Sequence, residues 1–301
     1  MYQNASTYNS YLTELAQAAY ADEKAGIGAL LFPAVKVPTA IGSYKKRDID
    51  AAFRSYDTLL ARGNSAKAID VNATEAYYSV KPHGLKVSTW RFDIDQESGN
   101  EERESNLQDL MSSQLISREA EAVRIFKAGI TVTSGAGNWS SATADPVAEL
   151  NALILQIHKA IGRMPTHLVI GLKAWGMLQT NAKMLTRIGG IGVDVTIERV
   201  RAMLVYPGLE IVIASLPYQA AARGTTGDME YIAGSDVFCF YTQDAPTRND
   251  MSVAKDFTLS PGGPEVLSHD NNDTMETIDT LYWSSDRQVT CPAAGARLEI
   301  T

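Results

Sequence analysis

The residue types that most often carry catalytic or metal chemistry are sparse in this sequence. Its 301 residues include four histidines, His83, His158, His167 and His269, and two cysteines, Cys239 and Cys291. None of them forms an HExxH, a CxxC or another close pair, so the spacing favours neither a zinc site nor a local nucleophile and base. We expect His158 and His167 to be packed and hydrogen-bonded, and His83 and His269 to lie in solvated turns.

Glycine-rich segments could bind phosphate groups, but their surroundings match no phosphate-binding loop. Residues 188–192 read Ile-Gly-Gly-Ile-Gly and lack the Gly-Lys-Ser/Thr ending of a P-loop and the strand and acidic residue of a dinucleotide site. Gly26 and Gly28 fit a turn before an apolar segment. The GxSxG elbow of many hydrolases is also missing. The sequence therefore predicts no catalytic residue and no cofactor.

An acidic stretch lies at the start of the longest helical pattern in the chain. Its members are Asp93, Asp95, Glu97, Glu101, Glu102 and Glu104. Carboxylates are common ligands of divalent cations, but carboxylates near a helix N-terminus are already favoured by the helix dipole. The sequence therefore predicts no metal site here.

One compact basic cluster stands out, Tyr44-Lys45-Lys46-Arg47, and two aspartates follow it within three residues. The whole chain carries 27 Lys and Arg against 35 Asp and Glu, a formal net charge of -8. Nucleic-acid binders neutralise phosphates with much larger basic surfaces. We therefore interpret the cluster as a charged part of an extended arm that pairs with an acidic surface of another subunit.

The composition is that of a globular chain, with 45% hydrophobic and 21% charged residues. No apolar run approaches the roughly 18 to 20 residues that a membrane-spanning helix needs, and the N-terminus lacks the pattern of a signal peptide. Two distant cysteines and no export signal favour a reducing compartment.

Residues 39–87 form an unusual excursion with mixed charge and few apolar residues. Its two flanks, 40–49 and 75–87, have strand-like patterns. A two-stranded hairpin is marginally stable alone in water. We therefore expect this excursion to rest on another surface.

Helical and strand patterns alternate through the rest of the chain. A short amphipathic helix is expected over 8–22 and a short helix or strand over 29–32. The strongest periodicity predicts a long helix over about 105–127. Beyond it, the patterns predict an α/β unit with helices over 145–161, 173–180 and 196–204 and strands over 166–171, 209–214 and 235–241.

The C-terminal part has a different character. Residues 247–273 are polar and contain Pro-Gly-Gly-Pro, which predicts a loop. Strands are expected over 274–283 and 286–291, and the apolar end at 293–300 is expected to join a sheet. The order of all these segments indicates an α+β fold.

Three local motifs in this order resemble the tailed-bacteriophage major capsid proteins of the Hong Kong 97-like fold. The first is Leu-Phe-Pro-Ala-Val-Lys-Val at 31–37, and the second is the end of the long helix from Arg118 to Phe126. The third is Pro-Thr-His-Leu-Val-Ile-Gly at 165–171, followed by Trp175 and Leu178. The likeness extends over nearly the whole chain.

The resemblance implies a domain layout. An N-terminal arm would occupy 1–36, an extended loop 37–89, a peripheral domain with its spine helix 90–145, an axial domain 146–250, and the return strands of the peripheral domain 251–301. It implies that the extended loop lies over a neighbouring subunit. The residues expected at inter-subunit contacts are Tyr44, Lys45, Lys46, Arg47, Tyr77 and Tyr78.

The resemblance also implies a function as a capsid protein without catalysis. Hexamers and pentamers of the chain would close an icosahedral shell, assembled in the host cytoplasm and located in the virion. The shell would enclose the phage DNA without sequence-specific binding. The implied partners are a portal and a separate scaffolding protein, with prior cleavage of a fused scaffolding region as the alternative to the latter. A decoration protein is left open. No Lys–Asn cross-link between subunits and no membrane association are predicted.

Two other functions are compatible with the sequence. An encapsulin-type nanocompartment shares the fold, and the helix expected at 8–22 is compatible with it. Co-purification with a cargo enzyme would distinguish it from a phage shell. A more remote alternative is an enzyme built on the α/β unit at 145–241, which would be a monomer or small oligomer with a deep polar pocket.

Overall fold

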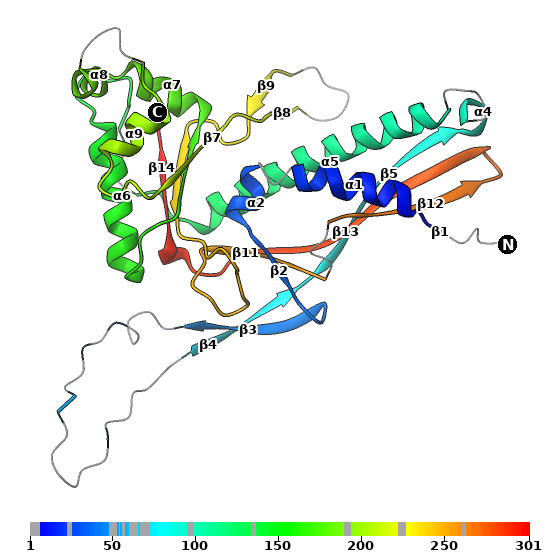
Figure 1. Cartoon of the computed structure of the whole chain (residues 1–301), viewed down its shortest axis with the longest axis horizontal. Helices are drawn as coiled ribbons and strands as arrows, with labels where there is room; N and C mark the ends of the chain where they lie inside the picture. Colours follow the sequence, from blue (N-terminus) through cyan, green and yellow to red (C-terminus); the bar gives the residue numbers. More distant parts are fainter. Residues whose placement is uncertain are drawn as a thin grey trace.

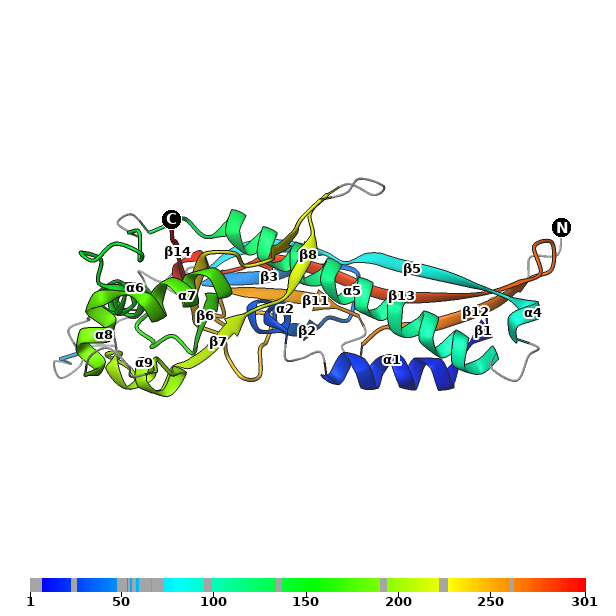
Figure 2. The ribbon, with the colours of Figure 1, turned by 90° about the horizontal axis from the view of Figure 1, so that it is seen from above.

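The computed structural model describes residues 7–22, 26–47, 73–94, 99–133, 137–189, 194–221, 227–259 and 263–301, with a few single residues between 53 and 66. The described chain has an elongated part and a more rounded α/β part, joined end to end (Figures 1 and 2). Within the described residues, no helix is long and apolar enough to cross a membrane.

A single long helix, α5 (Gly99–Gly129), forms the axis of the elongated part. Its 31 residues span about 46 Å at 1.5 Å per residue. The helix predicted over 105–127 is confirmed, but it begins six residues earlier. Glu101 and Glu102 therefore lie in its first turn, where the helix dipole stabilises their negative charge.

A mixed sheet of six strands runs beside α5. The central strand is β13 (Glu276–Val289), which pairs with β12 (Glu265–Asn271), β5 (Lys81–Trp90) and β11 (Ala254–Thr258). The outer strands are β1 (Thr7–Tyr8) next to β12 and β2 (Ala34–Lys36) next to β11. All pairs are antiparallel except that of β11 with β2.

The N-terminal segment packs along the same long helix. The predicted helix over 8–22 is confirmed as α1 (Ser10–Asp22), and the short apolar segment forms the helix α2 (Ile27–Leu31). A small apolar core joins α1, α5 and the sheet; its buried members are Leu12, Ala16, Leu107, Leu110, Met111, Val266 and Leu281. Burial of this apolar surface holds α1 against α5.

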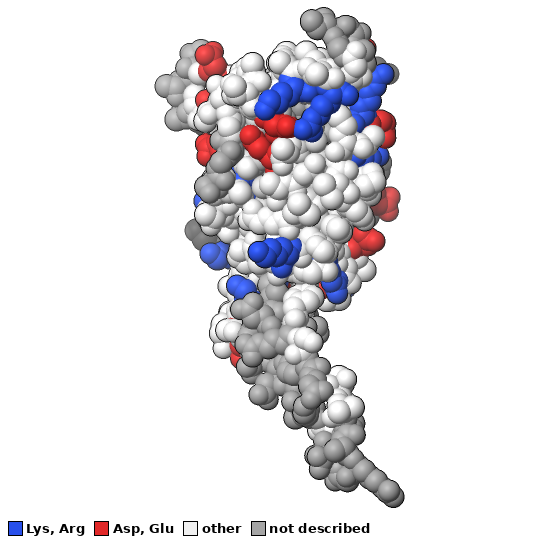
Figure 3. Space-filling view, turned by 90° about the vertical axis from the view of Figure 1, so that its left-hand side faces the viewer, with Lys and Arg blue, Asp and Glu red and all other residues white. Residues whose placement is uncertain are grey.

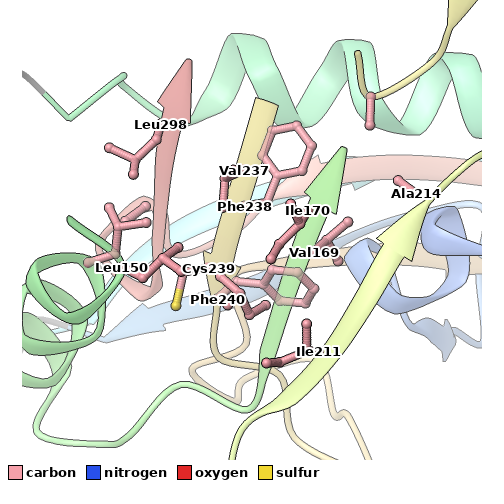
Figure 4. Packing of buried hydrophobic residues seen from close by; sticks show 14 of the residues in the cluster. Leu150, Val169, Ile170, Ile211, Ala214, Val237, Phe238, Cys239, Phe240 and Leu298 are labelled. Atoms are coloured by element: carbon pink, nitrogen blue, oxygen red, sulfur yellow. The ribbon is translucent and has the colours of Figure 1, made fainter. Parts of the chain in front are cut away.

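The α/β part is built on a four-stranded sheet in the order β14 (Gly295–Glu299), β10 (Asp236–Phe240), β6 (His167–Gly171), β7 (Glu210–Ala214). Its helices are α6 (Pro146–Ile161), α7 (Leu172–Thr180), α8 (Ala182–Ile188) and α9 (Ile197–Met203). All five residues of β10 are buried, and Figure 4 shows its side chains between those of β6, β14 and α6. The predicted helices and strands of the α/β unit are therefore confirmed. The sequence analysis missed α8 and the short antiparallel pair β8 (Pro217–Gln219) and β9 (Met229–Tyr231).

The long helix joins the two parts. Phe126, near the end of α5, packs edge-on against Phe238 and Phe240 of β10, with ring centroids 5.3 and 5.7 Å apart. All three rings are buried in the main apolar core. A single core therefore continues from the elongated part into the α/β part.

Several expectations for the C-terminal third are wrong. Residues 247–273, predicted as a loop, contain β11 and β12, and the two strands predicted over 274–291 form the single strand β13. β11 was missed because its charged residues are not typical of a buried strand. Inside the fold these charges are neutralised by partners. Lys255 is buried in an ion pair with Asp250, and Asp256 contacts Arg287.

The final strand also differs from the layout that the resemblance implied. β14 was expected to return to the elongated part, but it pairs with β10 along all five of its residues. The 3-10 turn at Pro292–Ala294 redirects the chain from the end of β13 to this position. The α/β part therefore consists of two separate stretches of sequence.

Candidate inter-subunit surface

A two-stranded hairpin, separate from the main sheet in its strand pairing, extends from the elongated part (Figure 1). It consists of β3 (Ile41–Arg47) and β4 (Ala73–Ser79), paired antiparallel along seven residues. The sequence pattern over 75–87 had indicated one strand. The structure divides it between β4 and β5, and β5 belongs to the main sheet because it pairs with β13 along ten residues.

The inner face of the hairpin packs on the chain's own sheet. Tyr44 and Tyr78 both pack on the Phe257 ring of β11, with centroid distances of 5.3 and 4.9 Å. All three side chains are buried. Gly42 lies opposite Tyr78 in the register, and a Cβ there would overlap the Tyr78 ring. Glycine at this position therefore lets the tyrosine lie flat across the hairpin.

Hydrogen bonds fix the base of the hairpin to the same subunit. The Ser79 amide donates to Asp286 Oδ2 over 2.7 Å, and the Lys45 amide donates to Asn249 Oδ1 over 2.9 Å. Gln288 Nε2 donates to the Tyr77 carbonyl over 3.2 Å. These bonds and the aromatic contacts set the direction in which the hairpin leaves the body.

The outer face of the hairpin is uncovered. Ile41 is 73% exposed and Tyr77 is 69% exposed, and the register places both on the face opposite Tyr44 and Tyr78. Lys45 lies on this outer face directly across from Glu75, whose carboxylate accepts a 2.7 Å hydrogen bond from Ser43. A face with exposed apolar side chains beside charges is typical of a protein-binding surface.

The structure divides the six residues that we expected at inter-subunit contacts. Tyr44 and Tyr78 are covered by the chain itself, so in this conformation they position the hairpin rather than face a neighbour. Lys45, Lys46 and Tyr77 are exposed, and the side chain of Arg47 lies outside the described residues. The sequence analysis missed Ile41 and Phe257. The alternation of residues 41, 43 and 45 with 42 and 44 could have identified the former, whereas Phe257 lay in a segment predicted as a loop.

The residues that could carry chemistry do not converge within the described part of the chain. No group of three or more His, Cys, Asp and Glu side chains there is placed to hold a metal ion. Both cysteines are free and buried, and burial raises the pKa of each thiol. A buried thiol with a raised pKa is a poor nucleophile.

The histidines differ in part from expectation. His167 is packed as expected: its ring stacks on Phe240, and its Nδ1 lies 2.7 Å from the Thr166 hydroxyl. Burial lowers the pKa of His167, and nearby carboxylates oppose this effect. His158 is exposed on α6 rather than packed. His83 and His269 lie in β5 and β12 rather than in turns, and His83 stacks on Trp283.

Glu119 of α5 holds the N-terminal segment from inside the fold. Its Oε2 accepts a 2.8 Å hydrogen bond from the Gly28 amide in the first turn of α2. The side chain is buried, and this burial raises the pKa of its carboxyl, although the Gly28 bond and two nearby arginines oppose the rise. Grooves of about 450 and 410 Å³ adjoin this contact, and both are lined by Leu115 and Glu119.

The raised pKa of Glu119 leads to a prediction about pH. The folded state holds a proton on this group more readily than the unfolded chain, so its contribution to stability increases as pH falls from neutral toward the ordinary carboxyl pKa of about 4.3. Glu119→Gln removes the titration while keeping an acceptor for Gly28. In urea titrations between pH 7 and pH 4.5, the variant is expected to gain less stability on acidification than the wild type. Equal gains would contradict the prediction, and Glu102→Gln controls for losing a carboxylate from the same helix.

Charge is sparse on the end of the α/β part opposite the elongated part. Figure 3 shows this face: basic side chains gather near its upper end, and a wide area carries neither sign. Helices α6, α8 and α9 lie on this side (Figure 1). Arg187 of α8 is paired with Asp145, and Arg201 of α9 is paired with Glu198. This face therefore lacks a continuous basic track among its described residues.

Comparison with known proteins identifies the fold. No family model and no curated protein matches the sequence. A phage-related protein of Bordetella bronchiseptica RB50 is 20% identical, with a TM-score of 0.74 over 98% of both chains. The mature capsid of bacteriophage PhiM1 is 12% identical, with a TM-score of 0.54 over 90% of this chain and 85% of that one.

An encapsulin complex of Synechococcus elongatus PCC 7942 has the same architecture. It is 12% identical, with a TM-score of 0.53 over 90% of this chain and 86% of that chain. The overall fold is therefore shared along most of the chain with a phage capsid and an encapsulin. This chain has the Hong Kong 97-like capsid fold.

Proposed function

We propose that the chain is the major capsid protein of a tailed phage, a structural protein that assembles into hexamers and pentamers of a closed shell. The outer face of the β3–β4 hairpin carries this proposal. The chain covers one side of the hairpin and leaves Ile41 and Tyr77 exposed on the other. A neighbouring subunit is the surface that such an extension requires, and the fold of a phage capsid supports this interpretation.

The domain layout follows the resemblance with two adjustments. The extended loop spans 37–80, because β5 is part of the main sheet. The N-terminal arm remains 1–36 and the elongated part corresponds to the peripheral domain. The α/β part corresponds to the axial domain and includes β14. With axial domains gathered around the capsomer axis, each hairpin is directed toward an adjacent subunit.

The remaining properties of the proposed shell come from the same resemblance. The shell encloses DNA without reading its sequence, assembles in the host cytoplasm and becomes part of the virion. A separate scaffolding protein and a portal are its expected partners, and a decoration protein is compatible with it. Catalysis is not part of the proposal.

An encapsulin-type compartment is the second candidate function. The fold of the encapsulin complex and the helix α1 near the N-terminus favour it. A cargo enzyme that co-purifies with particles, in place of a scaffolding protein or DNA, would support this alternative over the phage shell.

Removing the exposed apolar side chains of the hairpin tests the proposed contact. In the double variant Ile41→Ser and Tyr77→Ser, the packing of the inner face on Phe257 is unchanged. The subunit should therefore unfold at the wild-type temperature. The yield of closed particles in electron micrographs is expected to fall at least tenfold. Val205→Ser, at an exposed site outside the hairpin, is the control. If the double variant gave wild-type yields, the outer face of the hairpin would not be part of the contact.

The basic residues of the hairpin lead to a prediction about salt. Lys45 and Lys46 are exposed, and an interface that pairs them with carboxylates is weakened by charge reversal. Lys45→Glu with Lys46→Glu should lower particle stability more than the matched glutamine variant. The difference should shrink at high salt, because the Debye length falls to about 3 Å at 1 M. Light scattering during a salt titration measures this. Equal stability of both variants at low salt would exclude a charged contact.

A further inference from the structure

One aromatic residue of the extended loop rests on the α/β part of the same chain. Phe53 follows the end of β3 and is the one phenylalanine in residues 37–80. Its ring lies directly against Gly162, because a Cβ built on that glycine would overlap the ring. Gly162 ends α6, which lies on the side of the molecule toward which the open end of the hairpin points (Figure 1). The loop therefore contacts its own subunit at a second place, apart from the contact of its base with Phe257.

The surface under Phe53 is fixed by contacts of its own. The Gly162 amide donates to the His158 carbonyl over 2.8 Å, and the φ of Gly162 is 65°. The next residue, Arg163, donates from Nη1 to the Tyr241 hydroxyl over 2.7 Å, and its guanidinium carbon lies 5.5 Å from the centre of that ring. None of these contacts involves Phe53. The surface therefore keeps its shape when the Phe53 ring leaves it.

The contact with Gly162 buries much less than the contact at the base of the hairpin. The Phe53 side chain is 55% exposed, whereas Phe257, which contacts Tyr44 and Tyr78, is fully buried. The free energy gained by apolar burial is roughly proportional to the area buried. The base of the hairpin is therefore held firmly, while the contact of Phe53 can form and break. A contact that is exchanged for another needs this property, because only a small free-energy difference keeps both states accessible.

We infer that the contact of Phe53 with Gly162 is autoinhibitory, because it keeps the extended loop on its own subunit until a neighbouring subunit replaces it. The inference rests on the proposed shell function, in which this loop lies over a neighbour. A loop that is held on its own α/β part does not lie over another subunit at the same time. Each subunit must therefore break this contact when it joins a shell, so the contact raises the concentration at which shells form.

A substitution at Gly162 displaces Phe53 without changing it. Asparagine tolerates the left-handed conformation that Gly162 has at the end of α6, and its Cβ would take the place of the Phe53 ring. In light scattering, particles of Gly162→Asn should appear at a concentration about threefold to tenfold below that of the wild type, as expected for the loss of a partly buried aromatic contact. Gly234→Asn is the matched control, since its φ is 59° and the nearest non-neighbouring atom would lie 3.7 Å from its Cβ. Equal concentrations for the two variants would overturn the inference.

Phe53→Ser removes the other partner of the same contact. It should lower the concentration by the same factor as Gly162→Asn. The double variant should lower it no further, because both substitutions remove one interaction. A Phe53→Ser variant that needs a higher concentration than the wild type would overturn the inference, since Phe53 would then help to join subunits. A wild type that forms no particles at any concentration would instead refute the shell function.

Hydrogen exchange of free subunits tests the contact apart from the shell function. Below the concentration at which particles form, the amides from His158 to Gly162 should exchange at least threefold faster in Phe53→Ser than in the wild type, because the ring no longer covers the end of α6. Exchange in β6 should not change. Ile41→Ser, at an exposed site of the same hairpin, is the control and should leave both regions at wild-type rates. Wild-type exchange at the end of α6 in Phe53→Ser would show that the ring does not rest there in solution and would overturn the inference.

Discussion

Asp256→Ala is expected to lower the free energy of unfolding by about 3 to 5 kcal/mol, the range for removing one partner of a buried ion pair. The Asp256 carboxylate accepts a 2.6 Å hydrogen bond from Ser285 and lies 3.3 Å from Arg287 and 3.5 Å from Arg118. It thereby connects β11, β13 and α5. Its removal leaves the Arg287 guanidinium, which is 5% exposed, without its nearest carboxylate.

Two further variants separate charge from hydrogen bonding in this network. Asp256→Asn keeps an acceptor for Ser285, so its loss of stability should fall between the wild type and Asp256→Ala. Glu198→Ala removes one partner of the exposed pair with Arg201 and should change stability by less than about 1 kcal/mol. Urea denaturation of all three variants at pH 7 measures these differences. An Asp256→Ala variant as stable as Glu198→Ala would show that the buried network contributes little.

Phe257→Ala is expected to release the hairpin from the body of the subunit. The Phe257 side chain is fully buried and contacts the rings of Tyr44 and Tyr78, and truncating a buried phenylalanine costs about 3 to 5 kcal/mol. Hydrogen exchange should quicken at the amides of β3 and β4 and stay slow in β6 and β10. Because the hairpin would then lack a fixed direction, closed particles should also be lost.

The opposite face of the same hairpin provides the control for this variant. Ile41→Ala truncates an exposed side chain, so the unfolding free energy and the exchange rates should match the wild type. Its effect should be limited to assembly. If Phe257→Ala left the amide hydrogen exchange of β3 and β4 unchanged, the position of the hairpin would not depend on its aromatic contacts with Phe257.

The elements best predicted from the sequence are those with strong local signals. Helix α6 was predicted from Asp145 as its N-cap and Pro146 at its first position. In the structure Asp145 accepts a hydrogen bond from the Ala148 amide, and Gly162 ends the helix in a left-handed conformation. After their first residues, His167 and Asp236, the strands β6 and β10 are apolar runs, as expected for strands buried on both faces. Such signals depend on neighbouring residues alone.

The elements that were missed depend on distant partners. β11 contains the buried charges Lys255 and Asp256. Lys255 pairs with Asp250, which is near in sequence, but Asp256 is neutralised by Arg287, 31 positions away. The assignment of residues 81–90 to the main sheet rests on pairing with β13, nearly 200 positions away. No periodicity within either segment contains this information.

The candidate site was predicted in outline but not in detail. The low apolar content of residues 39–87 and the basic cluster at 44–47 indicated an extension that contacts another surface. The alternation of side chains then sends Tyr44 and Tyr78 inward to Phe257 and leaves Tyr77 outward. A shift of one residue in register would reverse this assignment, and the register is set by contacts with β11 and β13 that the sequence pattern does not reveal.

The central claim is that surfaces left uncovered on one copy are covered by other copies of the same chain. The most direct measurement is the size of the purified full-length chain at increasing concentration, followed by analytical ultracentrifugation and electron microscopy. We expect closed particles of uniform size built from this chain. A chain that sediments as a folded monomer at every concentration, with Ile41 and Tyr77 still open to solvent, would contradict the account.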